Sequence, residues 1–366
     1  MRKKIALYIS SLRRGGAERV MANLAGYFYG EGYQVLMVTT RKEETEYELP
    51  EGIVRRISEP PSQELCGGRI SNFKKRFSGL REIWKEEKPD VILSFIGKNN
   101  MMAILTSRGL KIPVAVSVRG EPTEEYYNKG LRLIARHLFD LADGVVLQTK
   151  RSRDFFPKRV QKKAVILRNP VHPDFFRKPF EGEREKTVVA VGRVDENKNH
   201  ELLIRAFAQI AGDFPEYKLL IYGEGEKRKA LQELAGDLGL EERILLPGNE
   251  EHVEEAIYRA RVFVLPSNTE GMPNTLIEAM LLGLTVIATD CPCGGCAELI
   301  EHEQNGLLTP VEDVEKMREN LRRVLAHPRE ADRMGRNAAQ LRDLYQARAV
   351  YGGWKEYLEG LMGERA

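Results

Sequence analysis

The sequence has 366 residues, of which 42% are hydrophobic and 30% charged, and its formal net charge at pH 7 is +3. A chain of this length is expected to form two α/β domains. The small net charge and the lack of alternating basic and aromatic residues argue against nucleic acid as a partner. The sequence contains no apolar run of about 18 residues and no signal-peptide pattern, which predicts a cytoplasmic protein without a spanning helix.

In the first half of the chain, apolar runs of strand length alternate with longer helical patterns. This alternation predicts βαβ units around a buried parallel sheet. The expected strands are 5–9, 35–39, 91–95, 114–118, 145–147 and 165–167, and the expected helices include 18–29 and 125–142.

One predicted helix of this half carries an apolar stripe among basic residues. The stripe consists of Ile70, Phe73, Phe77, Leu80 and Trp84, and it is flanked by Lys74, Lys75, Arg76 and Arg81. We expect this helix to pack on its sheet; the alternative is contact with a membrane surface or a lipid acceptor.

A second set of alternating elements follows a proline-containing stretch at 169–185, which is typical of a linker between domains. Its expected strands are 187–191, 219–222, 244–246, 262–265 and 286–289, with helices at 200–210, 228–238 and 275–282. Three helical patterns, 314–326, 329–344 and 348–361, come last, and no strand is expected after them.

Ligands of open α/β sheets bind beyond the carboxyl ends of the strands, so the loops that follow the strands are the candidate sites. After the first strand, Gly15 and Gly16 permit close approach of the backbone, and the helix that follows offers free N–H groups to an anion. The alternative is a glycine N-cap with Glu18 complementing the helix dipole. Gly223-x-Gly225 lacks the third glycine of a dinucleotide fingerprint.

Two cations follow the first strand of the second half. Arg193 and Lys198 lie just past this strand and before a helix. Such a pair is able to clamp a diphosphate, with a forked contact from arginine and a point charge from lysine. An ordinary solvated loop is the alternative.

Two glutamates and a tight turn follow the strand that ends at residue 265. Glu270 precedes Gly271 and Pro273, and Glu278 lies in the first turn of the helix expected to begin near Asn274. Glu278 also fits a capping box with Thr275, which needs no ligand to explain it.

With these motifs the sequence resembles family 4 of the retaining glycosyltransferases, which have the GT-B fold. The resemblance runs from end to end through Gly15-Gly16-Ala17-Glu18, Val191-Gly192-Arg193 with Lys198, and Glu270 followed by Glu278. It implies two Rossmann-like domains that face a central cleft. The implied domains are an acceptor domain at 1–170, a donor domain at 171–345, and a C-terminal helix at 346–366 that packs on the N-terminal domain.

The resemblance also implies roles for individual residues. Arg193 and Lys198 are expected to hold the donor diphosphate, Glu278 the ribose, and Glu270 the hydroxyls of the donor sugar. Gly15 and Gly16 are expected to approach the phosphate from the opposite domain. The segment that supports sugar and phosphate comprises Gly271, Met272, Pro273, Asn274, Thr275 and Leu276. Glu270, Arg193 and Lys198 are the expected catalytic residues, and no metal or other cofactor is expected.

The implied activity is transfer of a hexose or N-acetylhexosamine from a nucleotide diphosphate sugar, with uridine as the first expectation. The acceptor is expected to be a glycan or a lipid-linked molecule. The alternatives are a nucleotide-sugar epimerase and a non-catalytic protein that binds sugar nucleotides. Arg119 stands where many relatives carry a histidine, and we assign it to the acceptor side.

Basic clusters in the first half predict peripheral attachment to the inner face of the cytoplasmic membrane, if they share one face. The clusters are Arg13 and Arg14, Lys74–Arg76, and the segment from Lys150 to Lys163. The isolated Cys66 and the group Cys291, Cys293 and Cys296 are expected to be reduced thiols. No fourth ligand accompanies the three, and the six histidines show no metal-binding spacing.

Overall fold

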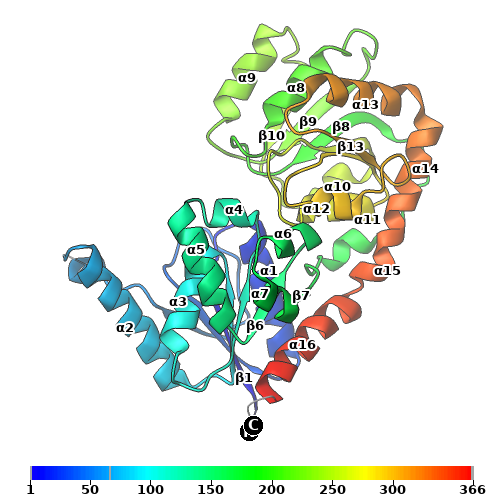
Figure 1. Ribbon diagram of the computed structural model, residues 1–366. Helices are drawn as coiled ribbons and strands as arrows, with labels where there is room; N and C mark the ends of the chain where they lie inside the picture. Colours follow the sequence, from blue (N-terminus) through cyan, green and yellow to red (C-terminus); the bar gives the residue numbers. More distant parts are fainter. Residues whose placement is uncertain (1, 66, 364–366) are drawn as a thin grey trace. The chain divides into compact units, whose positions relative to one another are not determined.

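The computed structural model describes residues 2–65 and 67–363; Cys66 lies outside this part of the chain. The chain divides into two compact units, Met1–Pro170 with Ala347–Ala366, and Val171–Gln346. Each unit contains one parallel sheet covered by helices (Figure 1).

The first unit is built around a seven-stranded sheet in which all paired strands are parallel, in the order β3-β2-β1-β4-β5-β6-β7. Its strands are β1 (Lys4–Ile9), β2 (Gln34–Thr39), β3 (Val54–Ile57), β4 (Val91–Phe95), β5 (Val114–Ser117), β6 (Gly144–Leu147) and β7 (Ala164–Ile166). The central strands β1 and β4 are almost fully buried, as expected for runs of valine, isoleucine and leucine between two helical layers.

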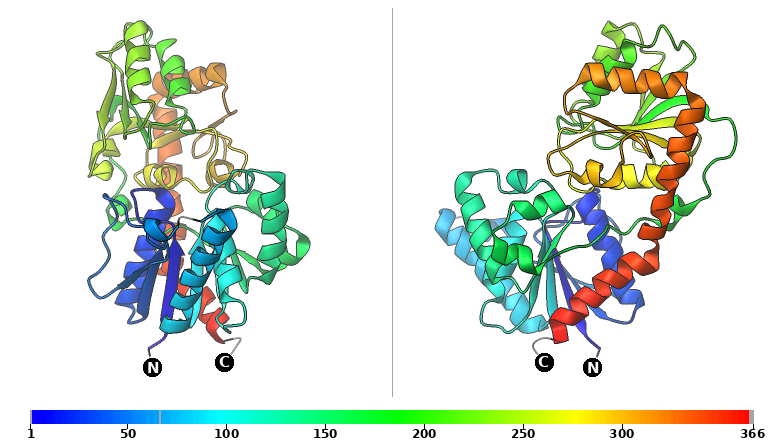
Figure 2. Two further views of the ribbon diagram at one scale, coloured as in Figure 1. Left: turned by 90° about the vertical axis from the view of Figure 1, so that its left-hand side faces the viewer. Right: turned by 45° about the vertical axis from the view of Figure 1, so that its right-hand side comes forward.

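Two layers of helices cover this sheet (Figure 2). One layer contains α1 (Gly16–Gly30) and α16 (Ala347–Gly363), which contact each other. The other contains α2 (Arg69–Glu87), α3 (Gly97–Ser107), α5 (Lys129–Leu138) and α7 (Lys158–Lys163), and the short α4 (Pro122–Glu125) and α6 (Lys150–Asp154) follow the carboxyl ends of β5 and β6. Within that layer α3 contacts both α2 and α5.

The second unit repeats the strand order of the first with six parallel strands, β10-β9-β8-β11-β12-β13. They are β8 (Glu185–Val191), β9 (Lys218–Tyr222), β10 (Ile244–Gly248), β11 (Ala260–Leu265), β12 (Thr285–Thr289) and β13 (Leu307–Thr309). Its helices are α8 (His200–Ala208), α9 (Arg228–Asp237), α10 (Val253–Tyr258), α11 (Asn274–Leu281), α12 (Gly295–Leu299), α13 (Val314–Ala326), α14 (Pro328–Ala338) and α15 (Arg342–Tyr345).

The predicted α/β class with two Rossmann-like sheets is confirmed, but two short strands were missed and one helix prediction is wrong. The edge strand β3 and the short β13, which lies between β12 and the last helices, were not predicted. The helix predicted at 125–142 is divided, because α4 ends at Glu125 and α5 begins only at Lys129, where the side chain of Asn128 caps the new helix.

The expectation that α2 packs on its sheet is confirmed for the last part of the helix only. Only the last part of the helix is buried, through Leu80, Ile83 and Trp84. Ile70 is 75% exposed and Phe73 is 48% exposed, so the first half of the stripe faces solvent. In the described part of the chain, no helix combines the length and the apolarity that crossing a membrane requires.

The C-terminal helix α16 packs against the first unit, as expected. Trp354 is fully buried, its ring lies 5.9 Å from that of Phe95, and its indole N–H donates to the carbonyl of Arg168 at 2.9 Å. On the preceding turn, Tyr351 stacks on Tyr27 of α1 at 4.5 Å. The end of the chain therefore completes the core in which the first strands lie.

Candidate functional site

Both sheets contain a point at which the order of the strands reverses. In the first unit β1 lies between β2 and β4, and in the second β8 lies between β9 and β11. Ligands of open parallel sheets bind beyond the carboxyl ends of the strands at such a reversal. We call the loops after β1 and β4 the first switch point, and the loops after β8 and β11 the second switch point. The donor-site residues predicted between 193 and 278 lie on the second switch point or in α11.

The loop after β8 carries Arg193 and Lys198. The Asp195 carboxylate orders this loop, since it accepts the backbone N–H of Lys198 at 2.9 Å and pairs with the Arg193 guanidinium at 3.1 Å. The Arg193 side chain is 59% exposed and can turn toward a ligand. Gly223 follows β9 with φ +136, and a Cβ there would lie 1.9 Å from the Gly192 carbonyl oxygen. Glycine is therefore required where these two loops meet.

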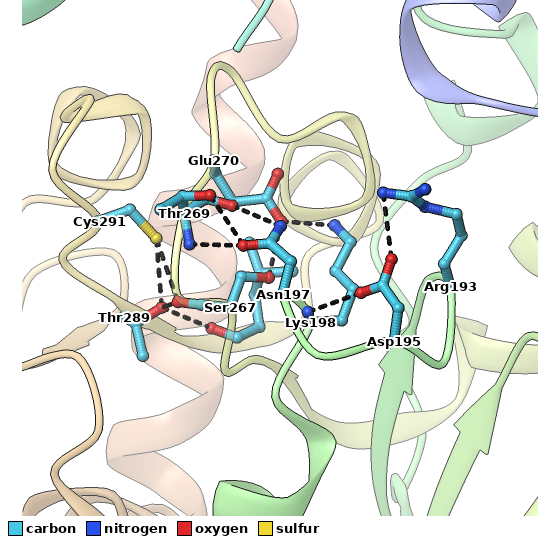
Figure 3. A network of polar contacts seen from close by, with 10 residues as sticks. Arg193, Asp195, Asn197, Lys198, Ser267, Thr269, Glu270, Thr289 and Cys291 are labelled. Atoms are coloured by element: carbon cyan, nitrogen blue, oxygen red, sulfur yellow. Dashed lines mark hydrogen bonds and ion pairs between the residues drawn. The ribbon is translucent and has the colours of Figure 1, made fainter. Parts of the chain in front are cut away.

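The loop after β11 carries Glu270, and residues at the end of β12 and just after it form hydrogen bonds to this loop. The Thr289 hydroxyl donates to the Ser267 carbonyl at 2.5 Å, and the Cys291 thiol contacts the same oxygen at 3.3 Å. The Ser267 hydroxyl in turn donates to Glu270 Oε1 at 2.7 Å. A chain of hydrogen bonds thus runs from the sheet to the Glu270 carboxylate (Figure 3).

The two loops meet through the residues with the strongest functional predictions. Lys198 Nζ lies 2.5 Å from Glu270 Oε1, and the two side chains are 15% and 12% exposed. The neighbouring His200 is buried, and burial, with Lys198 as a smaller cause, lowers its pKa to about 4. His200 is therefore neutral near pH 7, and Lys198 provides the positive charge beside Glu270.

Glu278 lies inside α11 and is 2% exposed. The capping box that was its alternative explanation is not formed, because the helix begins at Asn274 after an N-cap at Pro273, with no hydrogen bond from a capping side chain. Thr275 is therefore already within the first turn. The structure leaves a buried carboxylate whose position capping does not explain.

The loop with three cysteines supports the turn after Glu270. Gly295 opens α12, and a Cβ at this residue would lie 1.7 Å from the Gly271 carbonyl oxygen, so only glycine fits there. Cys291, Cys293 and Cys296 are buried free thiols. The hydrogen bond between the Cys291 and Cys296 thiols lowers the pKa of Cys291 and raises the pKa of Cys296. In the part of the chain that is described, no three His, Cys, Asp or Glu side chains are placed to hold a metal ion.

At the first switch point, Gly15 is the N-cap of α1 and Glu18 lies in its first turn. This is the arrangement of the alternative interpretation, a glycine N-cap that needs no ligand. The loop between β1 and α1 is held by Glu46, which pairs with Arg55, and both of these residues lie later in the chain. These form a two-point ion pair with distances of 2.5 and 3.0 Å, and Glu46 also accepts the backbone N–H of Leu12 at 3.2 Å. The hydrogen bond from Arg55 is the main reason that the pKa of Glu46 falls to about 2.

Arg119, assigned to the acceptor side, is held inside the first unit. Its guanidinium lies 4.4 Å above the Phe95 ring and 6.0 Å from Trp354, and it donates to the Asn169 side chain. Burial lowers its pKa to about 9. Nearby, Glu125 accepts three backbone N–H groups, those of Gly97, Arg119 and Gly120.

Several residues of the second switch point, and one at the end of the neighbouring strand β12, were not predicted from the sequence. They are Asp195, Asn197, Ser267, Thr269 and Thr289, and all of them hydrogen-bond to backbone or to neighbouring side chains. Both loops are rich in Asn, Asp, Ser and Thr, which commonly form such local bonds. That composition was the available signal, but it does not say which loops are joined.

Comparison with protein families matches both units. Residues 14–175 match the family model described as Glycosyltransferase Family 4, and residues 171–341 match the model described as Glycosyl transferases group 1. A relative from Campylobacter jejuni is 29% identical over 88% of this chain and 89% of its own length. It is an alpha-1,4-N-acetyl-D-galactosaminyltransferase, whose name gives its acceptor as a diNAcBac-PP-undecaprenol that carries GalNAc.

Solved structures show the same fold at lower identity. Sucrose-phosphate synthase from Thermosynechococcus elongatus matches with a TM-score of 0.82 and 20% identity over 99% of this chain and 100% of that one. HepE from Anabaena in complex with UDP and glucose matches with a TM-score of 0.82 and 17% identity over 98% of this chain and 100% of that one. The similarity to these structures establishes the GT-B fold.

Proposed function

The chain belongs to glycosyltransferase family 4, and we propose that it transfers a hexose or N-acetylhexosamine, with retention, from a uridine diphosphate sugar to a glycan or lipid-linked acceptor. The observation that carries the donor part of this proposal is the contact between Lys198 and Glu270 at the second switch point. A cation beside a carboxylate at this position supports the proposal, because parallel sheets bind nucleotides beyond the carboxyl ends of their strands.

Breaking the bond to the anomeric carbon requires stabilisation of negative charge on the departing diphosphate. Lys198 supplies one charge there, and its ammonium group has three N–H donors, so it can bind a phosphate oxygen while it contacts Glu270. Arg193 supplies a forked contact once it turns away from Asp195. The N-terminus of α11 adds the partial positive charge of its free N–H groups. These groups perform the stabilisation without a metal ion.

Glu270 is assigned to the donor sugar and Glu278 to the ribose. Glu270 Oε1 accepts from both Lys198 and Ser267, which fixes its carboxylate for hydrogen bonds from sugar hydroxyls. We assign no covalent attack to it, and the leaving phosphate takes the proton of the acceptor. In the first unit, Gly15 and Gly16 stay assigned to the phosphate and Arg119 to the acceptor side.

The test of the donor proposal is release of free nucleoside diphosphate from a panel of uridine, guanosine, adenosine and thymidine diphosphate sugars. It is run with and without a chelator, and with a membrane extract as the source of acceptor. We expect release from a uridine diphosphate sugar, unaffected by the chelator. Donor turnover without a transferred product would instead indicate an epimerase or a hydrolase, and binding without turnover would indicate a silent sugar-nucleotide-binding protein.

The acceptor part of the proposal is attachment to an anionic membrane surface that presents a lipid-linked diphosphate. It is supported by the exposed half of α2, where Ile70 and Phe73 face solvent. Between Arg69 and Arg81 this helix has five basic and no acidic residues. In the same helical layer, α5 exposes Leu133 (60%) and Ile134 (50%) beside Arg136 and His137, which are also exposed. Apolar residues among cations are typical of helices that bind anionic membrane interfaces.

Co-sedimentation with vesicles of graded anionic lipid content, at low and high salt, tests this part. We expect binding that rises with anionic lipid and falls with salt. Phe73→Ser should weaken it more than Phe214→Ser in the second unit, where an aromatic residue of the same size packs on the core. Binding that ignores lipid charge and salt, or no binding, would favour a water-soluble acceptor.

A further inference from the structure

The carboxamide of Asn197 joins the two loops of the second switch point. Its Nδ2 donates to the carbonyl of Thr269 at 3.0 Å, and its Oδ1 accepts the backbone N–H of the same residue at 3.0 Å. The Thr269 hydroxyl donates to the same oxygen at 2.8 Å. One amide side chain thus pairs with both the backbone N–H and the backbone carbonyl of Thr269, as the backbone of a neighbouring strand would (Figure 3).

Asparagine contacts on either side extend this pairing. The backbone N–H of Asn268 donates to the Asn197 carbonyl at 2.7 Å, and its side chain donates to the Glu196 carbonyl at 3.1 Å. Asn199 donates to the side chain of Asn268 at 2.9 Å from a left-handed backbone conformation (φ 44). Asparagine tolerates this conformation better than most residues, so the loop can turn back into contact.

Asn197 precedes Lys198 in the chain, and Thr269 precedes Glu270. The pairing of Asn197 with Thr269 therefore sets the backbone positions from which the other two side chains reach each other. We propose that Asn197 is a positioning residue, which holds the Lys198 loop in register with the Glu270 loop so that both side chains can bind the donor. This inference rests on the proposed function. Asn197 acts through these two residues and does not touch the donor itself.

The geometry requires asparagine in particular. Aspartate has the same shape but has no N–H to donate, so it would place a charged oxygen against the Thr269 carbonyl. Glutamine is longer by one methylene and would shift the two loops relative to each other. Alanine removes all three side-chain contacts with Thr269.

The test compares Asn197→Ala and Asn197→Asp with Asn305→Ala as a matched control. Asn305 makes the same kind of two-point contact after α12, with the Leu299 carbonyl at 3.0 Å and the Glu301 N–H at 2.8 Å. We expect kcat/KM for the donor to fall roughly 10- to 100-fold in both Asn197 variants, because small misplacements of catalytic groups are costly. Asn305→Ala should lower the melting temperature to a similar extent with less than about a threefold effect on kcat/KM.

A double-mutant cycle with Lys198→Ala distinguishes positioning from general structure. If Asn197 acts by placing Lys198 against Glu270, its replacement should cost less than about threefold once Lys198 is gone. An equal loss in both backgrounds would overturn the inference, because it would mean that the role does not pass through Lys198.

Hydrogen exchange separates this inference from the proposed function, because it needs no substrate. Asn197→Asp should raise the exchange of backbone amides in the segment 267–276 at least tenfold, and Asn305→Ala should not. Unchanged exchange would refute the pairing even in an active enzyme. If the wild type releases no nucleoside diphosphate but exchange responds as expected, the proposed function fails and the pairing of the loops stands.

Discussion

The two switch points have the same strand topology but are held in different ways. At the first, Asn99 in the first turn of α3, the helix that follows β4, donates a hydrogen bond of 2.9 Å to the Ser10 hydroxyl in the loop after β1. At the second, the Asn197 pairing and the Lys198–Glu270 ion pair join the loops directly. The repeated topology therefore does not determine how firmly a binding edge is organised; the side chains of the loops do.

The charges also serve different purposes. In the first unit the ion pair of Glu46 and Arg55 fixes the loop from outside, and neither residue is assigned to a ligand. In the second unit the ion pair consists of residues assigned to the donor itself. The second switch point is therefore expected to change its internal contacts when a donor binds, whereas the first is expected to keep its own.

The largest effect should come from breaking the ion pair of the second switch point. Lys198→Ala should lower kcat/KM about 100-fold, because it removes a shielded charge-assisted contact worth roughly 1.5 to 3 kcal/mol. Arg193→Ala should cost only about tenfold, since the Arg193 side chain is 59% exposed and that of Lys198 is 15% exposed. Initial rates of nucleoside diphosphate release measure both, and equal losses would contradict the ranking.

A smaller effect should follow from Glu278→Gln, which tests whether the buried Glu278 carboxylate accepts hydrogen bonds from the ribose of the donor. Glutamine keeps the size of the side chain but loses the anionic acceptor, so donor affinity should fall about tenfold. The melting temperature should change little. Calorimetric titration with uridine diphosphate measures the affinity, and a normal value in a folded variant would remove Glu278 from the proposed site.

The smallest effect on activity should come from Glu46→Gln at the first switch point. The folded-state pKa of Glu46 is about 2 against an ordinary value of 4.5, so its contribution to stability is present above about 4.5 and is lost as the pH falls toward 2. At pH 7 the variant should lose about 1 to 2 kcal/mol of unfolding free energy. That difference should shrink in acid, while activity at pH 7 changes less than about threefold.

Both tryptophans of the chain, Trp84 and Trp354, lie in the first unit. Their fluorescence during urea unfolding therefore reports that unit alone and measures the Glu46→Gln effect without interference from the second unit. An equal loss of stability at pH 7 and pH 3 would show that the pair of Glu46 and Arg55 does not act through its charge.

Much of the fold was predictable because buried strands and amphipathic helices leave periodic patterns. The strand Val91–Phe95 and the helix Val314–Ala326 were predicted with the bounds that the structure has. β3 was missed because it is a short edge strand with two arginines in four residues, and β13 because it has only three residues. Edge strands are not buried on both sides and need no apolar run.

The site was predictable to the extent that charge was involved. Lys198 and Glu270, singled out separately, lie in contact, while their roles toward a donor stay predictions. Asn197 and Ser267 were missed because neutral side chains that bond to backbone leave no period and no charge pattern in a sequence. Ser267 bonds to Glu270, three residues along the same loop, whereas Asn197 bonds to Thr269, 72 residues away, and only the folded chain shows which distant loop Asn197 meets.

The position of α16 has a consequence for the order in which the protein folds during synthesis. The second unit is one continuous segment, Val171–Gln346, whereas the first needs Ala347–Ala366 in addition to Met1–Pro170. Until Trp354 leaves the ribosome, the Phe95 and Arg119 side chains lack the ring that packs beside them. The half that is made first is therefore completed last, because its core needs a helix that is synthesised only after the whole second unit.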